Sequence, residues 1–389
     1  MLAFRPLPWE YGVRNLLRRP GRSALTWAGL TTVTLLILVV VGFVRGLEGS
    51  LALSGDANVV LVHSRGTQEN IEYSSVAGNT ADLLAASIQG IAERYGQHYV
   101  SGEVYLGTEV TREGAPQPTF GLVRGVTPAA LLVRRQVQIV EGHWPEPGEV
   151  LVGRLAATKL GWTKEDLEVG RTINLEGRTW KVCGWFAAGG SVLESEMWCP
   201  LADLQTAMKR QDLTLVALTL SPEGKFGDVS LFCKRQQDLE LEGTREQDYY
   251  ASLRHHYGPV RTAAWIVVFL IAGAGVFAGL NTMYGAVAGR VRELATLQAI
   301  GFVRRAIALS LVQEATLLAA FSTLTAAFIA LLFLHGAQVR FTMGAFALRI
   351  DSVAVLIGCA TGLLLGVVGA LPPAIRAMRM TIAVGLKAV

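Results

Sequence analysis

Three enzyme signatures are missing from this chain of 389 residues. It has no Gly-x-x-x-x-Gly-Lys-Ser/Thr phosphate-binding loop, no His-Glu-x-x-His zinc motif and no Gly-x-Ser-x-Gly nucleophile turn. The chain therefore cannot bind ATP through the usual loop, and it lacks the motifs of two common hydrolase classes. We expect a non-catalytic protein with no catalytic residues and no cofactor of its own.

Cysteine is also scarce, with four residues in the chain. Cys183, Cys199 and Cys233 fall in one central segment, without the Cys and His spacing that is typical of metal sites. If a disulfide forms, we expect Cys183 to pair with Cys199, because both lie in predicted strands. Buried reduced cysteines that act as small apolar side chains are an equally good interpretation. His255 and His256 point about 100° apart on a helix, so we expect no metal site there either.

Charge is almost absent from four stretches of the sequence, and only Glu314 and His335 interrupt them. The stretches are 23–44, 262–289, 306–339 and 352–375. A helix needs about 20 apolar residues to cross a hydrocarbon core of ~30 Å, so each stretch is long enough to span a membrane. The first is also longer than the ~7–15 apolar residues of a cleaved signal peptide, which favours a permanent anchor.

The order of these stretches predicts the fold class. We expect a membrane protein with four transmembrane helices in a 1 + 3 arrangement and a large α+β domain, of two lobes, between the first two. The expected segments are a cytoplasmic interfacial helix in 1–22, a span in 23–46, the α+β domain with stalk helices in 47–258 and three spans in 259–389. Within the domain, apolar residues at helical spacing predict a helix over 82–95.

Basic residues give the expected topology. Residues 1–22 carry a net charge of +4, and 290–305 and 376–389 carry +3 each, against +4 for the whole chain; the remainder therefore carries −6. Positive charge beside short loops marks the cytoplasmic side. We therefore expect both termini and the 290–305 loop inside the cell, with the large domain outside. No base-reading motif accompanies this charge, so we expect no nucleic-acid partner.

Two features of the spans predict contacts inside the bilayer. Small residues recur four apart, which lets helices approach closely; these are Gly275 and Gly279, then Gly358, Gly362 and Gly366. Glu314 would cost ~2.5–3.5 kcal/mol in hydrocarbon unless it has a partner. We expect it to pair with a basic loop residue such as Arg292 or Arg305; a conformational or proton-linked switch is the alternative.

The loop near 287–302 predicts a short amphipathic helix. Apolar residues recur there every third position, at Val291, Leu294, Leu297 and Ile300. Arg290 and Glu293 lie one turn apart and are expected to face solvent. Such a helix on a cytoplasmic loop suits docking into a groove of a partner; the alternative is a helix that rests on the membrane surface.

The sequence of this loop resembles a family signature. The stretch 281–302 reads NTMYGAVAGRVRELATLQAIGF, and Asn281, Arg290, Glu293 and Gly301 match the pattern of the FtsX/MacB-type permeases, the membrane subunits of one class of ABC transporters. Gln298 stands where an arginine is usual. The C-terminal stretch 372–387 and the segment 138–160, which is similar to a MacB-like periplasmic core domain, extend the resemblance over most of the chain.

The resemblance implies a function. In this family the loop is the coupling helix that docks in a separate ATPase subunit, which binds ATP and Mg. Arg290, Glu293, Leu294, Leu297 and Gly301 would then belong to the docking site. A permease of this kind sits in the bacterial inner membrane, works with a second copy or a paralogue, and often has a periplasmic adaptor protein. It passes ATP-driven motion to its periplasmic domain (mechanotransmission) for efflux or lipoprotein export; the alternative is a cargo-free permease that activates an envelope hydrolase.

Overall fold

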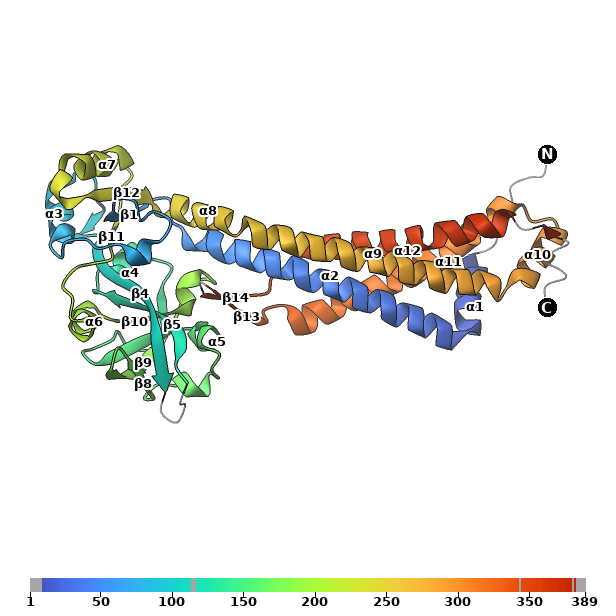
Figure 1. Ribbon diagram of the computed structural model, residues 1–389, viewed down its shortest axis with the longest axis horizontal. Helices are drawn as coiled ribbons and strands as arrows, with labels where there is room; N and C mark the ends of the chain where they lie inside the picture. Colours follow the sequence, from blue (N-terminus) through green and yellow to red (C-terminus); the bar gives the residue numbers. More distant parts are fainter. Residues whose placement is uncertain (1–8, 113–116, 343, 380, 383–389) are drawn as a thin grey trace. The chain divides into compact units, whose positions relative to one another are not determined.

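The computed structural model describes residues 9–112, 117–342, 344–379 and 381–382 (Figure 1). The described residues form two compact units. The helical unit comprises Met1–Arg45, Pro259–Ala337 and Leu348–Val389, and the α+β unit comprises Gly46–Gly258 and Gln338–Ala347.

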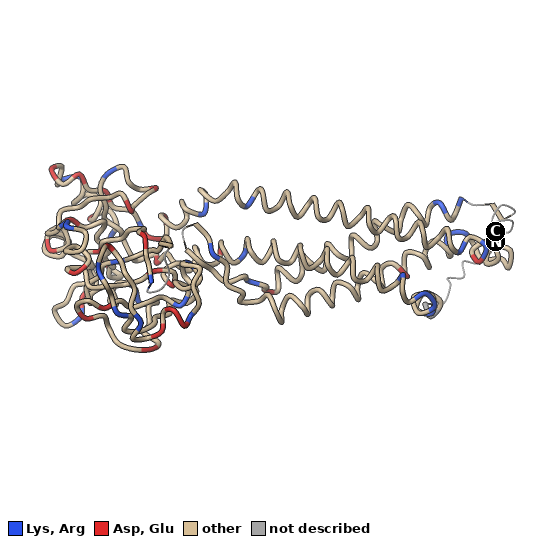
Figure 2. Tube along the Cα trace, turned by 60° about the horizontal axis from the view of Figure 1, so that its bottom comes forward, with Lys and Arg blue, Asp and Glu red and all other residues tan. Residues whose placement is uncertain are grey.

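Four long apolar helices confirm the predicted spans. They are α2 (Pro20–Ser54), α9 (Gly258–Ala288), α11 (Arg304–Ile329), which continues into a π-helical turn (Ala330–Leu334), and α12 (Ser352–Arg379). A short helix, α1 (Trp9–Arg18), precedes them. Pro20 begins α2 because proline fits the first helical position, where its missing N–H is not needed. Figure 2 shows that these helices carry few charged residues between their ends, as a hydrocarbon environment requires.

The glycines predicted to pack helices lie at helix contacts within this chain. A Cβ atom at Gly362 would overlap Thr323 of α11, and one at Gly366 would overlap Ala319 of the same helix. The other three have similar surroundings: Gly358 faces Leu38, Gly275 faces Val33 and Leu365, and Gly279 lies against Gly369. These small residues therefore let α2, α9, α11 and α12 approach one another closely.

Substituting Gly362 by alanine is expected to destabilise the helical unit by about 1–3 kcal/mol, because the added methyl group must displace Thr323. Gly273→Ala in α9 is the matched control, since a Cβ atom there meets nothing within 4 Å. The measurement is the midpoint temperature of thermal unfolding in detergent for each of the two variants. Equal midpoints would show that Gly362 is not a packing position.

One sheet of ten strands forms the frame of the α+β unit. Its order is β12-β1-β11-β4-β5-β10-β7-β9-β6, with β8 paired to β4 and β9. The strands are β1 (Val59–Ser64), β4 (Val100–Arg112), β5 (Thr119–Val126), β6 (Gln138–Gly142), β7 (Glu149–Gly153), β8 (Thr172–Leu175), β9 (Arg178–Ala187), β10 (Glu196–Pro200), β11 (Leu215–Thr219) and β12 (Leu241–Arg245).

The structure has one continuous sheet in a single compact unit where two lobes were expected, and the long strand β4 joins the two halves of that sheet. Its first residues, 100–103, pair with β11, whereas 104–110 pair with β5. Apolar side chains cover the sheet and include the fully buried Trp180 and Trp198. The mixed helices and strands confirm the α+β class.

Short helices complete the unit, and one of them differs from its prediction. The helices are α3 (Thr80–Ser87), α4 (Ala130–Val133), α5 (Ala156–Leu160), α6 (Leu201–Met208), α7 (Phe226–Arg235) and α8 (Glu246–His256). The predicted helix over 82–95 is wrong after Ser87, because Ile91 instead forms a bridge with Leu220 beside the sheet. A small hairpin, β2 (Glu93–Arg94) and β3 (Gln97–His98), follows and turns at Gly96, where φ is +77°.

The loop between α11 and α12 is a hairpin that belongs to the α+β unit. It consists of β13 (Gln338–Phe341) and β14 (Gly344–Ala347). The Lys159 ammonium of α5 donates a hydrogen bond of 2.6 Å to the Thr342 carbonyl. The Ser195 hydroxyl accepts from the Ala345 N–H at 2.7 Å and donates to its carbonyl at 3.1 Å. These polar contacts fix the hairpin to the domain.

Candidate functional site

The connection between α9 and α11 contains the predicted amphipathic helix, α10 (Val291–Ala299). Arg290 is its N-cap residue, and Gly301 ends it with a φ of +107°. The Phe302 N–H bonds the Leu297 carbonyl, and the Gly301 N–H bonds the Gln298 carbonyl, at 3.1 Å each. This is a Schellman ending, which glycine favours because it has no Cβ atom. Gly301 therefore serves to stop α10.

One face of α10 packs against its own chain. Leu294 is 4% exposed and lies in an apolar cluster with Ile307 and Leu311 of α11 and Ala374 of α12. Leu297 lies beside the same cluster and is partly buried. The expectation that Leu294 forms a free docking edge is therefore wrong: neighbouring helices supply the apolar surface that covers it.

The opposite face of α10 is open. Arg292 and Thr296 are exposed, and Ile300, just beyond the helix, is 71% exposed. An open hollow continues this surface, and its lining residues are Gln298, Gly301, Phe302, Val303, Arg304, Arg305 and Ile382. An exposed isoleucine beside basic side chains offers both apolar area and positive charge to a partner.

A buried ion pair attaches the start of α10 to α11. The Arg290 guanidinium donates two hydrogen bonds to the Glu314 carboxylate, of 2.8 and 2.9 Å, and both residues are 5% exposed. Two corrections follow: the partner of Glu314 is neither Arg292 nor Arg305, and Arg290 does not face solvent. Because Arg290 occupies the N-cap position, its side chain reaches back toward α11 rather than outward.

Glu293 makes a second link, to α1. The Tyr11 hydroxyl donates a hydrogen bond of 2.7 Å to the Glu293 carboxylate. Arg19, in the turn between α1 and α2, donates a bond of 3.1 Å to the Gly289 carbonyl. Helix α10 is therefore tied on its inner side to α1 and to α11, while its outer face is exposed in the part of the chain that the structure describes.

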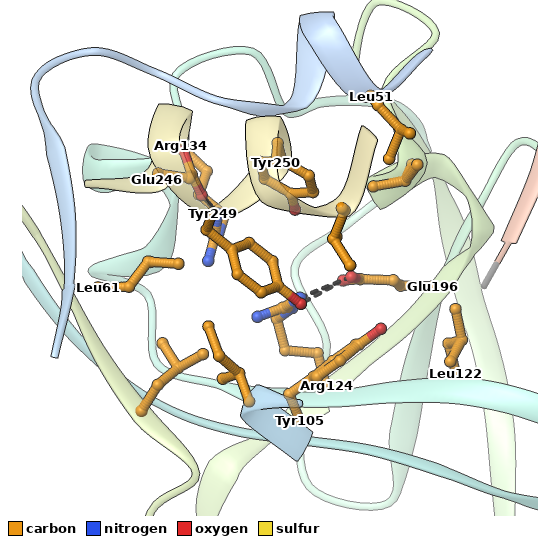
Figure 3. A pocket seen from close by; sticks show the side chains of 14 residues that line it. Leu51, Leu61, Tyr105, Leu122, Arg124, Arg134, Glu196, Glu246, Tyr249 and Tyr250 are labelled. Atoms are coloured by element: carbon orange, nitrogen blue, oxygen red, sulfur yellow. Dashed lines mark hydrogen bonds and ion pairs between the residues drawn. The ribbon is translucent and has the colours of Figure 1, made fainter. Parts of the chain in front are cut away.

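A second polar cluster lies inside the α+β unit, around a pocket beside α8 (Figure 3). Arg124 of β5 holds the Glu196 carboxylate through two hydrogen bonds of 2.7 and 2.6 Å and contacts Glu103 at 2.6 Å. Arg134, which follows α4, bonds Glu103 at 2.9 Å and pairs with Glu246 at the start of α8. We call these five residues, which are all buried, the charge network.

The charge network fixes α8 to the sheet. Glu246 also accepts a hydrogen bond of 3.1 Å from the Asp56 N–H, in the turn that follows α2. Figure 3 shows Tyr249 and Tyr250 of α8 above Arg124. Burial alone would raise the pKa of Glu103, but the charges of Arg134 and Arg124 lower it below its usual range. For Glu246, burial outweighs the charge of Arg134 and raises the pKa.

One residue of this network is recognisable in the sequence. Arg124 interrupts the apolar run of β5, and a charge in a buried strand needs partners. The other predicted positions play no part in either cluster. His255 and His256 are exposed on α8. Cys183 and Cys199 are buried and free, which agrees with the alternative of buried reduced cysteines and not with a disulfide.

Comparisons with known proteins match two family models. Residues 23–228 match the MacB-like periplasmic core domain, and residues 265–382 match the FtsX-like permease C-terminal domain. No curated protein matches the chain. The first model alone covers more than half of the sequence, and the second falls on three of the four apolar helices.

Two solved structures resemble the α+β unit distantly. The periplasmic region of MacB from Actinobacillus actinomycetemcomitans is 9% identical, with a TM-score of 0.39 over 52% of this chain and 94% of that one. The extracellular domain of the noncanonic ABC-type transporter YknZ from Gram-positive bacteria is 13% identical, with a TM-score of 0.36 over 48% of this chain and 100% of that one. Both scores are below 0.5, so the assignment to a family rests on the two family models.

Proposed function

The chain belongs to the FtsX/MacB-type permeases of ABC transporters, and from this premise we propose that it couples ATP hydrolysis by a separate ATPase subunit to movement of its α+β domain. The movement would drive export or extraction of a substrate from the periplasm or the outer leaflet. The chain itself would bind neither ATP nor Mg, which belong to the ATPase. The observation that carries the proposal is the open outer face of α10.

The attachments of α10 suit it to transmit force. A helix that only rested on the surface would need no buried ion pair, yet Arg290 and Glu314 join α10 to the long helix α11. The Tyr11–Glu293 hydrogen bond joins it to α1. Movement imposed on the outer face would therefore be passed to these helices rather than absorbed by a loose loop.

The basic segments favour an inner-membrane orientation. Residues 1–22, 290–305 and 376–389 carry the positive charge, which favours both termini and α10 in the cytoplasm and the α+β unit in the periplasm. An ATPase on the cytoplasmic side could reach α10 only in this orientation. A periplasmic adaptor protein would meet the α+β unit from the opposite side.

Helix α9 supports a second permease subunit, either another copy or a paralogue. Four residues of its 31 are buried, namely Val268, Gly275, Ala286 and Val287, so the helix touches its own chain along a narrow stripe. The large apolar residues Phe269, Leu270 and Phe277 are exposed. In a bilayer such a surface faces lipid or another helix. Because α9 contacts its own chain along a narrow stripe, most of its surface is available to a helix of a second subunit.

Replacing Ile300 by aspartate tests the docking site. The change leaves the buried face of α10 intact and places a charge on its exposed edge, so we expect association with the ATPase to weaken by about 2 kcal/mol, roughly thirty-fold. The effect is measured as the amount of ATPase that co-purifies with the tagged chain and as the ATPase activity of that preparation.

Val140→Asp is the matched control for this test. Val140 is 66% exposed, against 71% for Ile300, but it lies on β6 of the α+β unit. The control should retain the ATPase. If the Ile300→Asp variant retains the ATPase as well as the unmodified chain does, the ATPase docks elsewhere.

A further inference from the structure

Three metal-ligating side chains from separate parts of the sequence meet in the α+β unit. A ring nitrogen of His143, a carboxylate oxygen of Glu149 and the sulfur of Cys183 all lie within 4.8 Å of one another. Among the described residues, this is the group of histidine, cysteine and acidic side chains that could hold a metal ion. None of the three belongs to the charge network or to the surroundings of α10.

The strand order explains why these three side chains lie close together. Strand β9 lies between β6 and β7: Gly142 pairs with Gly184 on one side, and Val150 pairs with Val182 on the other. His143 directly follows β6, Glu149 begins β7, and Cys183 is in the middle of β9. Positions 143, 149 and 183 have no spacing typical of a metal motif, because the site forms through lateral strand pairing and not along one segment.

The local backbone holds the histidine close to the cysteine. Gly142 has a φ of +84°, and a side chain there would overlap the Cys183 carbonyl, so glycine is required at this position. The His143 N–H bonds the Cys183 carbonyl at 3.4 Å, and the Cys183 thiol contacts the His143 carbonyl at 3.5 Å. A ring nitrogen of His143 lies 3.6 Å from the Glu149 carboxylate.

The accessibility of the three residues differs in a way that suits a metal site. Cys183 is buried, Glu149 is half-buried and His143 is exposed. Two ligands are therefore held by the sheet. The exposed imidazole, whose Nδ1 lies 2.9 Å from the Trp144 carbonyl, would leave that contact to close over an ion that arrives from solvent. The open side leaves a fourth position for water or for a donor atom of another molecule.

We propose that His143, Glu149 and Cys183 bind a zinc ion. Thiolate, imidazole and carboxylate are the three ligand types of protein zinc sites, and three protein ligands with an open fourth position form a recognised arrangement. Calcium and magnesium prefer an all-oxygen set, so the sulfur and nitrogen ligands select against them. The ion would fix the turn between β6 and β7 to β9 and offer an exposed coordination position to a partner or a substrate.

Cobalt serves as the probe, because a Co²⁺–thiolate bond gives a charge-transfer band in the near ultraviolet. The full chain in detergent is first treated with a chelator and then titrated with Co²⁺. We expect one ion per chain, the thiolate band, and its loss when Zn²⁺ is added, since zinc binds such sites more tightly than cobalt. The readout is independent of any transport activity.

Variants assign the ligands. Cys183→Ser should remove the thiolate band, and His143→Ala, at an exposed position, should weaken Co²⁺ binding at least tenfold while the fold stays intact. Cys233→Ser is the matched control, because this cysteine is also buried in the α+β unit but lies outside the cluster. The Co²⁺–thiolate band should persist in this variant. Absence of the band in the unmodified chain, or its persistence in Cys183→Ser, would overturn the proposal.

Discussion

Replacement of Arg290 by methionine is expected to destabilise the helical unit by about 3–5 kcal/mol, the cost of leaving a buried charge without its partner. Glu314 is 5% exposed, and each of its two carboxylate oxygens accepts a hydrogen bond from the Arg290 guanidinium. With methionine at position 290, the buried carboxylate loses its charged hydrogen-bond partner. The free energy of unfolding in mixed detergent micelles measures the loss.

Two further variants separate the ion pair from other effects. Arg290→Met combined with Glu314→Met removes both charges and should recover most of the lost stability, because a pair of apolar residues can replace a buried ion pair. Arg292→Met is the matched control: Arg292 is two residues away but exposed, so its loss should change little. Equal destabilisation by Arg290→Met and Arg292→Met would contradict the structural role of the pair.

Replacement of Arg134 by methionine should have a similarly large effect on the α+β unit, about 3–5 kcal/mol. This arginine is the link between Glu103 in the sheet and Glu246 at the start of α8. Its removal leaves Glu246 with the Asp56 N–H as its remaining hydrogen-bond donor and Glu103 with Arg124 alone. The start of α8 should loosen from the sheet, in addition to the loss of global stability.

Hydrogen exchange of the α8 amides distinguishes local loosening from global unfolding. Faster exchange in α8 than in β9 would locate the damage at the charge network. Arg135→Met is the control, since the adjacent Arg135 is exposed and contacts the Tyr99 ring at 5.4 Å, a contact worth about 0.5–1 kcal/mol at such a site. If Arg134→Met and Arg135→Met behave alike, the network does not hold α8.

The sequence predicted the spans well and their contacts in part. Span prediction depends on a local property, the length of an apolar run, and all four runs are helices of 28 residues or more. The spacing of Gly358, Gly362 and Gly366 is also a local property, and it predicted a packing face. The identity of the residues opposite, such as Thr323 and Ala319, depends on how two distant helices align, which no local pattern contains.

The candidate site shows the limit of sequence reasoning most clearly. Spacing of apolar residues predicted α10, but could not tell which apolar residues its own chain covers and which remain open. Leu294 is covered because α11 and α12 meet there, whereas Ile300, in the same apolar series, is exposed. Proximity in sequence likewise suggested Arg292 or Arg305 for Glu314, although the N-cap geometry of α10 selects Arg290.

The partners of Arg124 in the charge network, and the proposed zinc site, were beyond prediction for a related reason. Glu103, Arg124 and Glu246 come from positions up to 143 residues apart, and strand register brings them together. The group of His143, Glu149 and Cys183 likewise depends on the order β6-β9-β7. Pairing between strands far apart in the chain leaves no periodic signal in one sequence.

The central claim, that a separate ATPase drives this permease through α10, is tested most directly by purifying the tagged chain from its native membrane in mild detergent. The proteins that accompany it are identified, and the ATPase activity of the preparation is measured. We predict a stoichiometric subunit with a phosphate-binding loop and ATP hydrolysis that depends on it. A preparation without such a subunit and without ATPase activity would contradict the account.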